Sequence, residues 1–287
     1  LEEKNLIKNK QIFDLLSNKM NLKNNVHGGY YELKKGTSFF ETIRILRGGL
    51  QTPVLFTLNN VNFKTDLAAK ISNQLEIDST AVMAFLSNDT LLNKMGYNTD
   101  DILTLFIPNT YEMYWNTSFS SFIDKMQKEH DAFWNENRIA KATNKGLTPK
   151  KAYILASIVE KEYKHAEERE RIAGVYINRI KKGMKLQADP TVKFALNNLA
   201  LKRILTVHTE YDNPYNTYFY TDLPPGPICL PETSTIEAVL NAENHNYLYF
   251  CAKADLSGYH EFNTNYAAHL NAARLYQAAL NKLNIYE

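Results

Sequence analysis

The amino-acid sequence predicts an α+β protein. Short apolar stretches bounded by turn residues alternate with runs whose apolar residues recur at helical spacing. Several of these runs begin at a Ser, Thr or Asp that can cap a helix. The chain has 287 residues and 44% hydrophobic content, enough for one large or two modest domains.

The N-terminal part has a strand and helix rhythm that occurs twice. Turn residues His27-Gly28-Gly29 and Lys35-Gly36-Thr37-Ser38 separate the first elements, and Gly48-Gly49 ends a helix. Simple α+β construction is the favoured explanation of the rhythm, and a true internal repeat is the alternative. The expected helices cover residues 9–22, 39–47, a stretch after 62–66, and 79–86, and the expected strands cover 30–33 and 53–58.

The C-terminal part is expected to begin near the apolar run Ile102–Ile107. This gives two domains, residues 1–105 and 106–287. Helices are expected at 118–133, at 149–164, and from about 167 to 182 before Gly183. Strands are expected at 247–250 and 260–262, and a final helix at 266–283.

Composition excludes several classes of site. Lys and Arg number 33 against 31 Asp and Glu, so charge gives no argument for nucleic acid. Cys229 and Cys251 form no CxxC pair, and both are interpreted as packing residues, with one disulfide left open. His260 and His269 lack a third ligand at a familiar spacing, so no metal or other cofactor is expected. No stretch reaches the roughly 18 to 20 apolar residues of a spanning helix.

The most informative segment is the predicted helix 149–164, which starts at a capping Thr148 and Pro149. Leu155, Ile158 and Val159 form an apolar stripe, and Glu162 falls inside it. A carboxyl in apolar surroundings is costly to ionise, so its pKa should rise toward neutrality. Glu162 is therefore a candidate general acid, although a glutamate paired with a nearby arginine would fit the helix pattern as well.

Downstream segments hold further polar and aromatic candidates. Asp189 before Pro190 fits both an N-cap and a second carboxylate. Tyr215-Asn216-Thr217-Tyr218 and the turn Leu223–Ile228 supply aromatic faces, amides and rigidity, as a sugar-binding groove requires. Asn178 would be buried only with hydrogen-bond partners for its amide.

Several ordered blocks together resemble the YceG-like (MltG) endolytic transglycosylase family. The dense part of the match lies in the C-terminal half, and residues 107–112 and 29–31 extend it thinly toward the N-terminus. The blocks are residues 156–162 (ASIVEKE), 166–169 (AEER), 175–179 (VYINR), 184–191 (MKLQADPT), 215–218 (YNTY), 223–228 (LPPGPI), 247–250 (YLYF) and 260–262 (HEF).

The resemblance implies a fold and a site. It implies a LysM-like N-terminal lobe, truncated at its start, followed by a mixed α/β catalytic lobe with a lysozyme-like glutamate helix. It makes Glu162 the catalytic residue, in agreement with the stripe. The substrate-binding set is then expected to be Gln187, Asp189, Tyr215, Asn216, Thr217, Tyr218 and Asn178. Tyr163 and Asn109 depart from the family's usual Thr and Asp.

The resemblance also implies an activity and a location. The expected reaction is lytic cleavage between N-acetylmuramic acid and N-acetylglucosamine in peptidoglycan, leaving 1,6-anhydro ends. Peptidoglycan strands are the expected partner, together with cell-wall synthases such as penicillin-binding proteins. The expected location is the inner membrane, held by a single N-terminal anchor that this chain lacks, with this region outside the cytoplasm.

Two other functions fit the same residues. A lysozyme-like hydrolase would use Glu162 and Asp189 as a carboxyl pair. A non-catalytic peptidoglycan-binding scaffold would use only the aromatic groove. The products separate them, because hydrolysis leaves a reducing end and lytic cleavage leaves an anhydro end.

Overall fold

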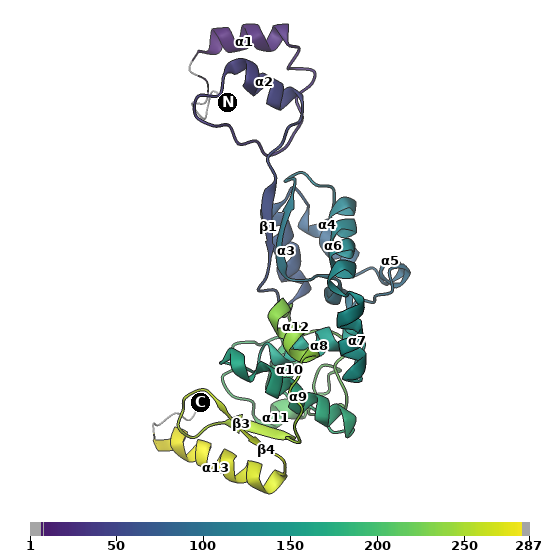
Figure 1. Ribbon diagram of the computed structural model, residues 1–287, viewed down its shortest axis with the longest axis vertical. Helices are drawn as coiled ribbons and strands as arrows, with labels where there is room; N and C mark the ends of the chain where they lie inside the picture. Colours follow the sequence, from purple (N-terminus) through teal and green to yellow (C-terminus); the bar gives the residue numbers. More distant parts are fainter. Residues whose placement is uncertain (1–6, 8, 283–287) are drawn as a thin grey trace.

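The structure is a computed structural model that describes residue 7 and residues 9–282, and it shows an elongated chain of three lobes (Figure 1). The first lobe packs α1 (Lys10–Lys19) against α2 (Phe39–Arg47). Its small core contains Phe13, Leu22 and Ile43. The prediction of a strand at 30–33 is wrong. The Tyr30 carbonyl accepts a bond from the Thr52 N–H, but the Glu32 N–H bonds to the Thr52 side chain, so this segment does not form a strand ladder.

The middle lobe is built on a two-stranded antiparallel ribbon. Strand β1 (Val54–Leu58) pairs with β2 (Asn109–Met113), from Val54 opposite Met113 to Leu58 opposite Asn109. The elements that complete this lobe are α3 (Lys64–Gln74), α4 (Ser79–Leu86), α5 (Asp89–Lys94), the 3-10 helix η1 (Ile102–Leu105) and α6 (Phe119–Phe133). Their common core contains residues on both sides of the expected division at 105 and 106.

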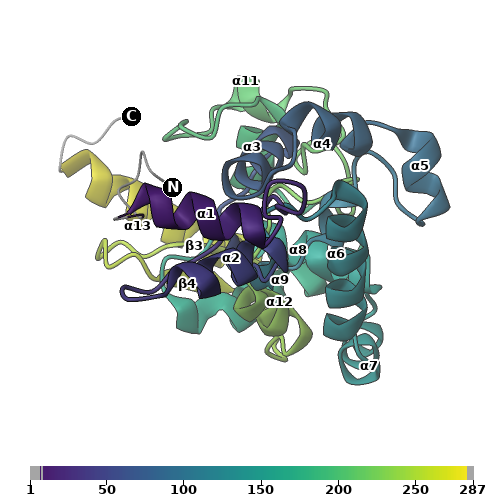
Figure 2. The ribbon, with the colours of Figure 1, turned by 90° about the horizontal axis from the view of Figure 1, so that it is seen from above.

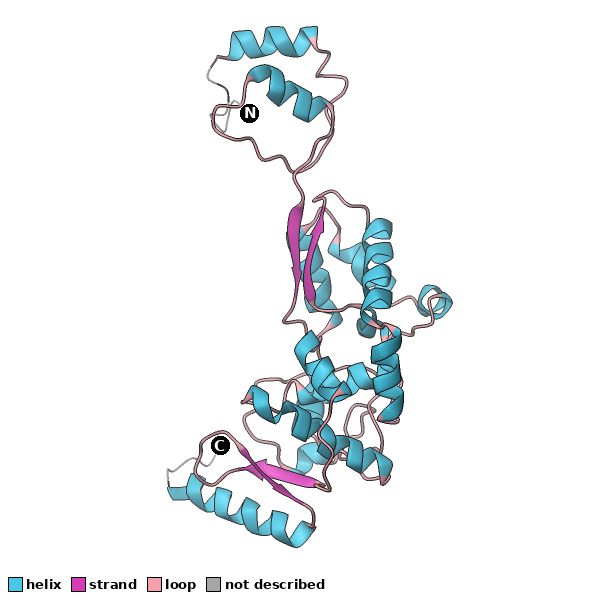
Figure 3. Ribbon diagram, in the orientation of Figure 1, coloured by secondary structure: helices cyan, strands magenta, loops and turns pink. Residues whose placement is uncertain are grey.

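The third lobe is mainly helical, with a small sheet at its far end (Figure 3). Its helices are α7 (Glu136–Asn144), α8 (Pro149–Val159), η2 (Ala166–Glu168), α9 (Arg169–Lys181), α10 (Asp189–Ala195), α11 (Thr206–Thr209) and α12 (Thr233–Leu240). Strands β3 (Tyr249–Ala252) and β4 (His260–Asn263) pair antiparallel, and α13 (Tyr266–Lys282) packs on both. Leu283, the expected end of this helix, lies outside the described residues.

Helix α8 is the centre of the third lobe. Thr148 caps it by accepting a bond from the Lys151 N–H, and every residue from Ala152 to Val159 is buried. A helix that is apolar on all sides is a core helix. Its neighbours are α7, α9 and α12, together with η1 of the middle lobe.

Helix α8 is shorter than expected. It ends at Val159 rather than near residue 164. The N–H groups of Lys161 and Glu162 bond to the carbonyls of Ile158 and Val159, three residues back, so the chain tightens into a turn. Glu162 therefore stands in the turn after the helix.

Helices α5 and α13 project from opposite sides of the molecule. Viewed from above, α5 projects from one side and α13 from the other (Figure 2). None of the described helices is long and apolar enough to cross a bilayer.

Candidate active site

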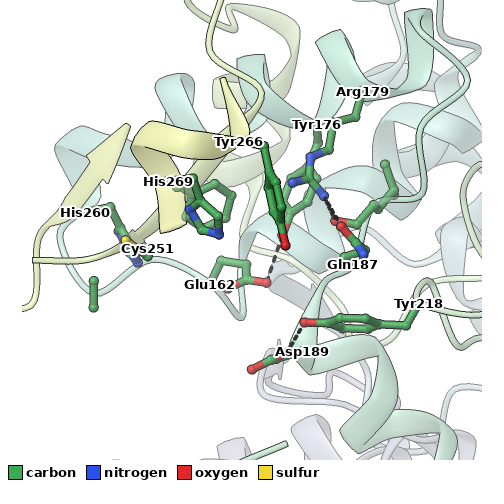
Figure 4. Close-up of a pocket in the computed structure, with 13 residues that line it drawn as sticks. Glu162, Tyr176, Arg179, Gln187, Asp189, Tyr218, Cys251, His260, Tyr266 and His269 are labelled. Carbon is green, nitrogen blue, oxygen red and sulfur yellow. Dashed lines mark hydrogen bonds between the residues drawn. The ribbon is translucent and has the colours of Figure 1, made fainter. Parts of the chain in front are cut away.

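A pocket of about 420 Å³ opens between α9, α10 and the β3–β4–α13 unit, with Glu162 on its wall (Figure 4). Three parts of the third lobe that are far apart in sequence contribute to it. Its lining residues are Glu162, Tyr176, Arg179, Leu186, Gln187, Asp189, Tyr218, Phe250, Cys251, Ala252, His260, Tyr266 and His269.

Glu162 is held by its own turn and by α9. Its backbone N–H is bonded to Val159, and its Oε1 accepts a 2.8 Å hydrogen bond from the Tyr176 hydroxyl. Tyr176 is buried on α9 and cannot turn away without leaving the core. One carboxylate oxygen is thus fixed while the half-buried side chain faces the pocket.

The surroundings of Glu162 favour its protonated form. Burial raises its pKa from 4.5 to about 7, and the charge of Asp189 acts in the same direction. The Tyr176 hydrogen bond and the cations Lys193 and Arg179 oppose this shift without cancelling it. Desolvation penalises the charged carboxylate more than these contacts stabilise it. A carboxyl with this pKa can donate and accept a proton near neutral pH.

Asp189 and Tyr218 form another part of the pocket wall. Asp189 is the exposed first residue of α10, and its Oδ1 accepts a 2.7 Å hydrogen bond from the Tyr218 hydroxyl. Burial and this carboxylate hold the pKa of Tyr218 well above its usual range, so the hydroxyl remains a donor. Asp189 is thus a negative charge near Glu162 in a more solvated position.

Arg179 is a fixed part of the pocket wall. It is buried and donates to the carbonyls of Leu248 at 2.6 Å and Leu186 at 2.8 Å, and to Gln187 Oε1 at 3.3 Å. Gln187 has φ +51°, a left-handed conformation that a non-glycine residue rarely adopts outside constrained sites. The exposed Gln187 amide is therefore presented to the pocket by a constrained backbone.

The structure brings only part of the predicted binding set to the pocket. Gln187, Asp189 and Tyr218 line it with Glu162. Asn178 instead donates to the carbonyls of His245 and Tyr247.

The other three predicted residues, Tyr215, Asn216 and Thr217, do not line the pocket. Asn216 is fully buried and donates to the carbonyls of Thr209 and Tyr211. Thr217 is buried against Thr191 and accepts from the Ala188 N–H, so both residues shape the loop rather than line the pocket. Tyr215 points elsewhere, with its hydroxyl 3.4 Å from Asp100.

Some residues of the pocket carry no signal in the local sequence that would predict their place in it. Tyr176 and Arg179 lie in the block 175–179. The spacing of Tyr176 predicts only a core residue, and Arg179 is only a charged residue near the end of a helix. Neither feature indicates which group the side chain will contact. Tyr266 and His269 lie on α13, and only the folding of that helix onto β3 brings them near Glu162. Periodicity identifies a buried face but not which element covers it.

His260, which lines the pocket, is held by Glu168. His260 Nδ1 lies 2.8 Å from Oε2 of the buried Glu168, whose other oxygen accepts from the His260 N–H. Both cysteines are free. Across residues 7 and 9–282, no three His, Cys, Asp or Glu side chains gather into a set that could hold a metal.

The mixed α/β fold places a carboxyl with a raised pKa in an open pocket of tyrosine, amide and arginine side chains, and general acid–base catalysis uses a carboxyl of this kind. The YceG-like family matches residues 1–275. The chain belongs to this family.

Three relatives illustrate the similarity. The chain is 32% identical over 244 residues to an endolytic murein transglycosylase of Bacillus subtilis, covering 79% of this chain and 67% of the relative. It is 28% identical over 308 residues to one of Streptococcus pneumoniae, covering 95% of this chain but 56% of the relative. The crystal structure of a yceG-like protein from Listeria monocytogenes superimposes with a TM-score of 0.64 at 27% identity, covering 94% of this chain and 92% of that one.

Proposed function

We propose that this chain is a lytic transglycosylase that cleaves peptidoglycan between N-acetylmuramic acid and N-acetylglucosamine. The observation that carries the proposal is Glu162, whose pKa is raised to about 7 by burial beside an open pocket. The names of the relatives, endolytic murein transglycosylase, supply the substrate class and the reaction.

The reaction needs one carboxyl that acts twice. Protonated Glu162 donates its proton to the bridging oxygen as the glycosidic bond breaks. The resulting carboxylate accepts the proton of the muramic acid C6 hydroxyl, whose oxygen attacks C1 and closes the 1,6-anhydro ring. Glu162 ends protonated, ready for the next bond.

The surrounding groups hold the sugar and the carboxyl. The Tyr176 hydroxyl bonds to the carboxylate and stabilises it after the first proton transfer. The Gln187 amide and the Tyr218 ring contact the sugar, and Asp189 stabilises positive charge at C1. A hydrolase would need a water activated by Asp189 instead.

The test is the substitution Glu162→Gln, assayed by digestion of purified sacculi and mass spectrometry of the fragments. We expect loss of anhydro-ended fragments by about 10²- to 10⁴-fold, the usual contribution of general acid–base catalysis. The matched control is Glu160→Gln, in the same turn, whose carboxylate accepts a bond from the Glu232 N–H. Persistent anhydro products in Glu162→Gln would sink the assignment.

The same assay separates the alternatives. Reducing ends in place of anhydro ends would make the protein a lysozyme-like hydrolase. Binding to sacculi without release of fragments by the unmodified chain would make it a scaffold.

We propose that the parts of the chain before and after residues 105 and 106 have different tasks. Residues 1–105 include a LysM-like lobe that binds glycan, and residues 106–287 form the catalytic part with a lysozyme-like arrangement around Glu162. The chain spans 67% and 56% of the lengths of the two relatives. Its proposed place is outside the cytoplasm, with the whole protein held at the inner membrane by an N-terminal anchor and working beside cell-wall synthases such as penicillin-binding proteins.

A further inference from the structure

Glu168 and His260 form a buried pair at the edge of the catalytic pocket, and the proposed mechanism does not use it. Glu168 belongs to η2, directly before α9, and His260 is the first residue of β4. Their side chains are only 6% and 12% exposed, so the pair is shielded from water. His260 lines the same pocket as Glu162. A buried ionisable pair beside a catalytic carboxyl is a candidate for a further role in the reaction.

Both oxygens of the Glu168 carboxylate contact His260. Oε1 accepts a 3.0 Å hydrogen bond from the His260 backbone N–H, and Oε2 lies 2.8 Å from Nδ1 of the ring. An ionised carboxylate has no hydrogen to donate, so Nδ1 carries the proton of this bond. In the neutral imidazole the other ring nitrogen, Nε2, is then a hydrogen-bond acceptor. Glu168 therefore selects the tautomer of His260.

The ring of His260 is also held in its orientation. It stands edge-on to Phe250, with ring centroids 5.2 Å apart and an interplanar angle of 89°, and its centroid lies 6.2 Å from that of Phe262. In the β3–β4 pair Ala252 is opposite His260 and Phe250 is opposite Phe262, so these four side chains share one face of the sheet. Phe250 and Ala252 line the pocket beside His260. The ring cannot rotate without losing its contact with Glu168.

Nε2 is the atom of the His260 ring that remains for a ligand. Among the described residues none bonds to it, and it is not one of the unpartnered side-chain atoms that are shut off from solvent. Because His260 lines the pocket, the open side of its ring is the pocket side. The pocket therefore contains a fixed acceptor whose tautomer is set by a buried carboxylate, the arrangement by which an aspartate orients the histidine of a catalytic triad.

His260 lies on the other side of Glu162 from the groups proposed to hold the muramic acid. In Figure 4, Glu162 lies between His260 on one side and Asp189 and Tyr218 on the other. The proposed mechanism places C1 of the muramic acid beside Asp189. The leaving N-acetylglucosamine is then on the His260 side. This sugar carries O–H and acetamido N–H groups, which are donors that Nε2 can accept from.

We propose that His260, oriented by Glu168, accepts a hydrogen bond at Nε2 from an O–H or N–H group of the leaving N-acetylglucosamine. His260 contacts the substrate, and Glu168 is a positioning residue that acts through it. The inference rests on the proposed function for its substrate. Its consequence is that the tautomer of His260, and not only its presence, determines how tightly the glycan binds.

The substitution Glu168→Gln changes the tautomer while it keeps the shape of the pair. The His260 backbone N–H can only donate, so the glutamine oxygen must take the place of Oε1 and the glutamine NH2 group must face Nδ1. Nδ1 then accepts, and the ring proton moves to Nε2, which becomes a donor. Nitrogen NMR of the isotope-labelled imidazole reports this change directly.

The test is binding of a peptide-free tetrasaccharide of alternating N-acetylglucosamine and N-acetylmuramic acid. It is measured by calorimetry at pH 8, which favours the neutral imidazole, in the Glu162→Gln background. We expect Glu168→Gln to weaken binding about tenfold, because one hydrogen bond is lost and two donors then face each other. His260→Asn should weaken binding about as much, because its amide can replace Nδ1 but leaves no atom in the place of Nε2. The two changes together should do no more than either alone.

Glu167→Gln is the matched control. Glu167 is the neighbour of Glu168 in η2, and its exposed carboxylate accepts a bond from the Tyr259 hydroxyl outside the catalytic pocket. This variant should bind the tetrasaccharide as tightly as the Glu162→Gln background does.

The outcomes separate this inference from the proposed function. Unchanged binding in His260→Asn overturns the contact at Nε2, because this variant keeps a partner for Glu168 and removes only the acceptor. Unchanged binding in Glu168→Gln, with the ring proton on Nε2, overturns the role of the tautomer. Failure of the unmodified chain to form anhydro ends from sacculi overturns the proposed function instead. Binding is measured without catalysis, so either can fail while the other stands.

Discussion

Replacing Glu162 by glutamine should stabilise the fold above neutral pH while removing activity. Burial raises the pKa of Glu162 from 4.5 to about 7, so the folded protein binds this proton more tightly than the unfolded chain does. The favourable contribution is complete below about pH 4.5 and is lost as the pH rises through about 7. The shift corresponds to at most about 3 kcal/mol at pH 8, and the half-buried position reduces the expected value to about 1 to 2 kcal/mol.

Urea unfolding at pH 5 and pH 8 measures this effect. Glutamine can still accept the Tyr176 hydrogen bond, so any cost of the amide is shared by both pH values and the difference between them isolates the titration. Glu160→Gln should lack the stabilisation at pH 8. A Glu162→Gln effect on the free energy of unfolding that is equal at both pH values would refute the raised pKa.

Three further predictions concern the neighbours of Glu162 and the lobe junction. Tyr176→Phe removes a hydrogen bond that lowers the pKa of Glu162, so the alkaline limb of the pH–activity profile should move to higher pH. Asp189→Asn removes a charge that raises this pKa, so the same limb should move to lower pH, and activity should fall less than in Glu162→Gln. Gly226→Ala places a Cβ 2.0 Å from the Asp100 carbonyl oxygen, and urea unfolding should show a loss of about 1 to 3 kcal/mol; an unchanged midpoint would contradict the close packing.

The helices were the part of the fold that local sequence predicted best. Ser38, Asp78 and Thr148 each cap a helix that begins at the next residue, as expected from their hydroxyl or carboxylate oxygens. These signals depend on neighbours within a few residues. Strand β2 was missed because its pairing with β1 joins residues more than fifty positions apart, from Leu58 with Asn109 to Val54 with Met113, which local pattern does not reveal.

The site was predicted only in part, because residue type and short spacing do not show which groups meet in the folded chain. The apolar stripe made Glu162 a candidate acid, and its raised pKa in the structure has the predicted cause, burial, although the residue follows the helix instead of ending it. Asn178 and Asn216 have side chains that suit a sugar, yet backbone carbonyls occupy their amides. An amide in a sequence does not reveal which partner it will find.

By itself the sequence determined the capped helices, the apolar surroundings of Glu162 and the resemblance to one family, because each depends on residue type and short spacing. Only the tertiary structure decided which groups meet that carboxyl. Tyr176 donates to it from α9, and Asp189 on α10 and His269 on α13 line the same pocket. Packing of these elements sets the burial and the charges around the carboxyl, and those determine its pKa.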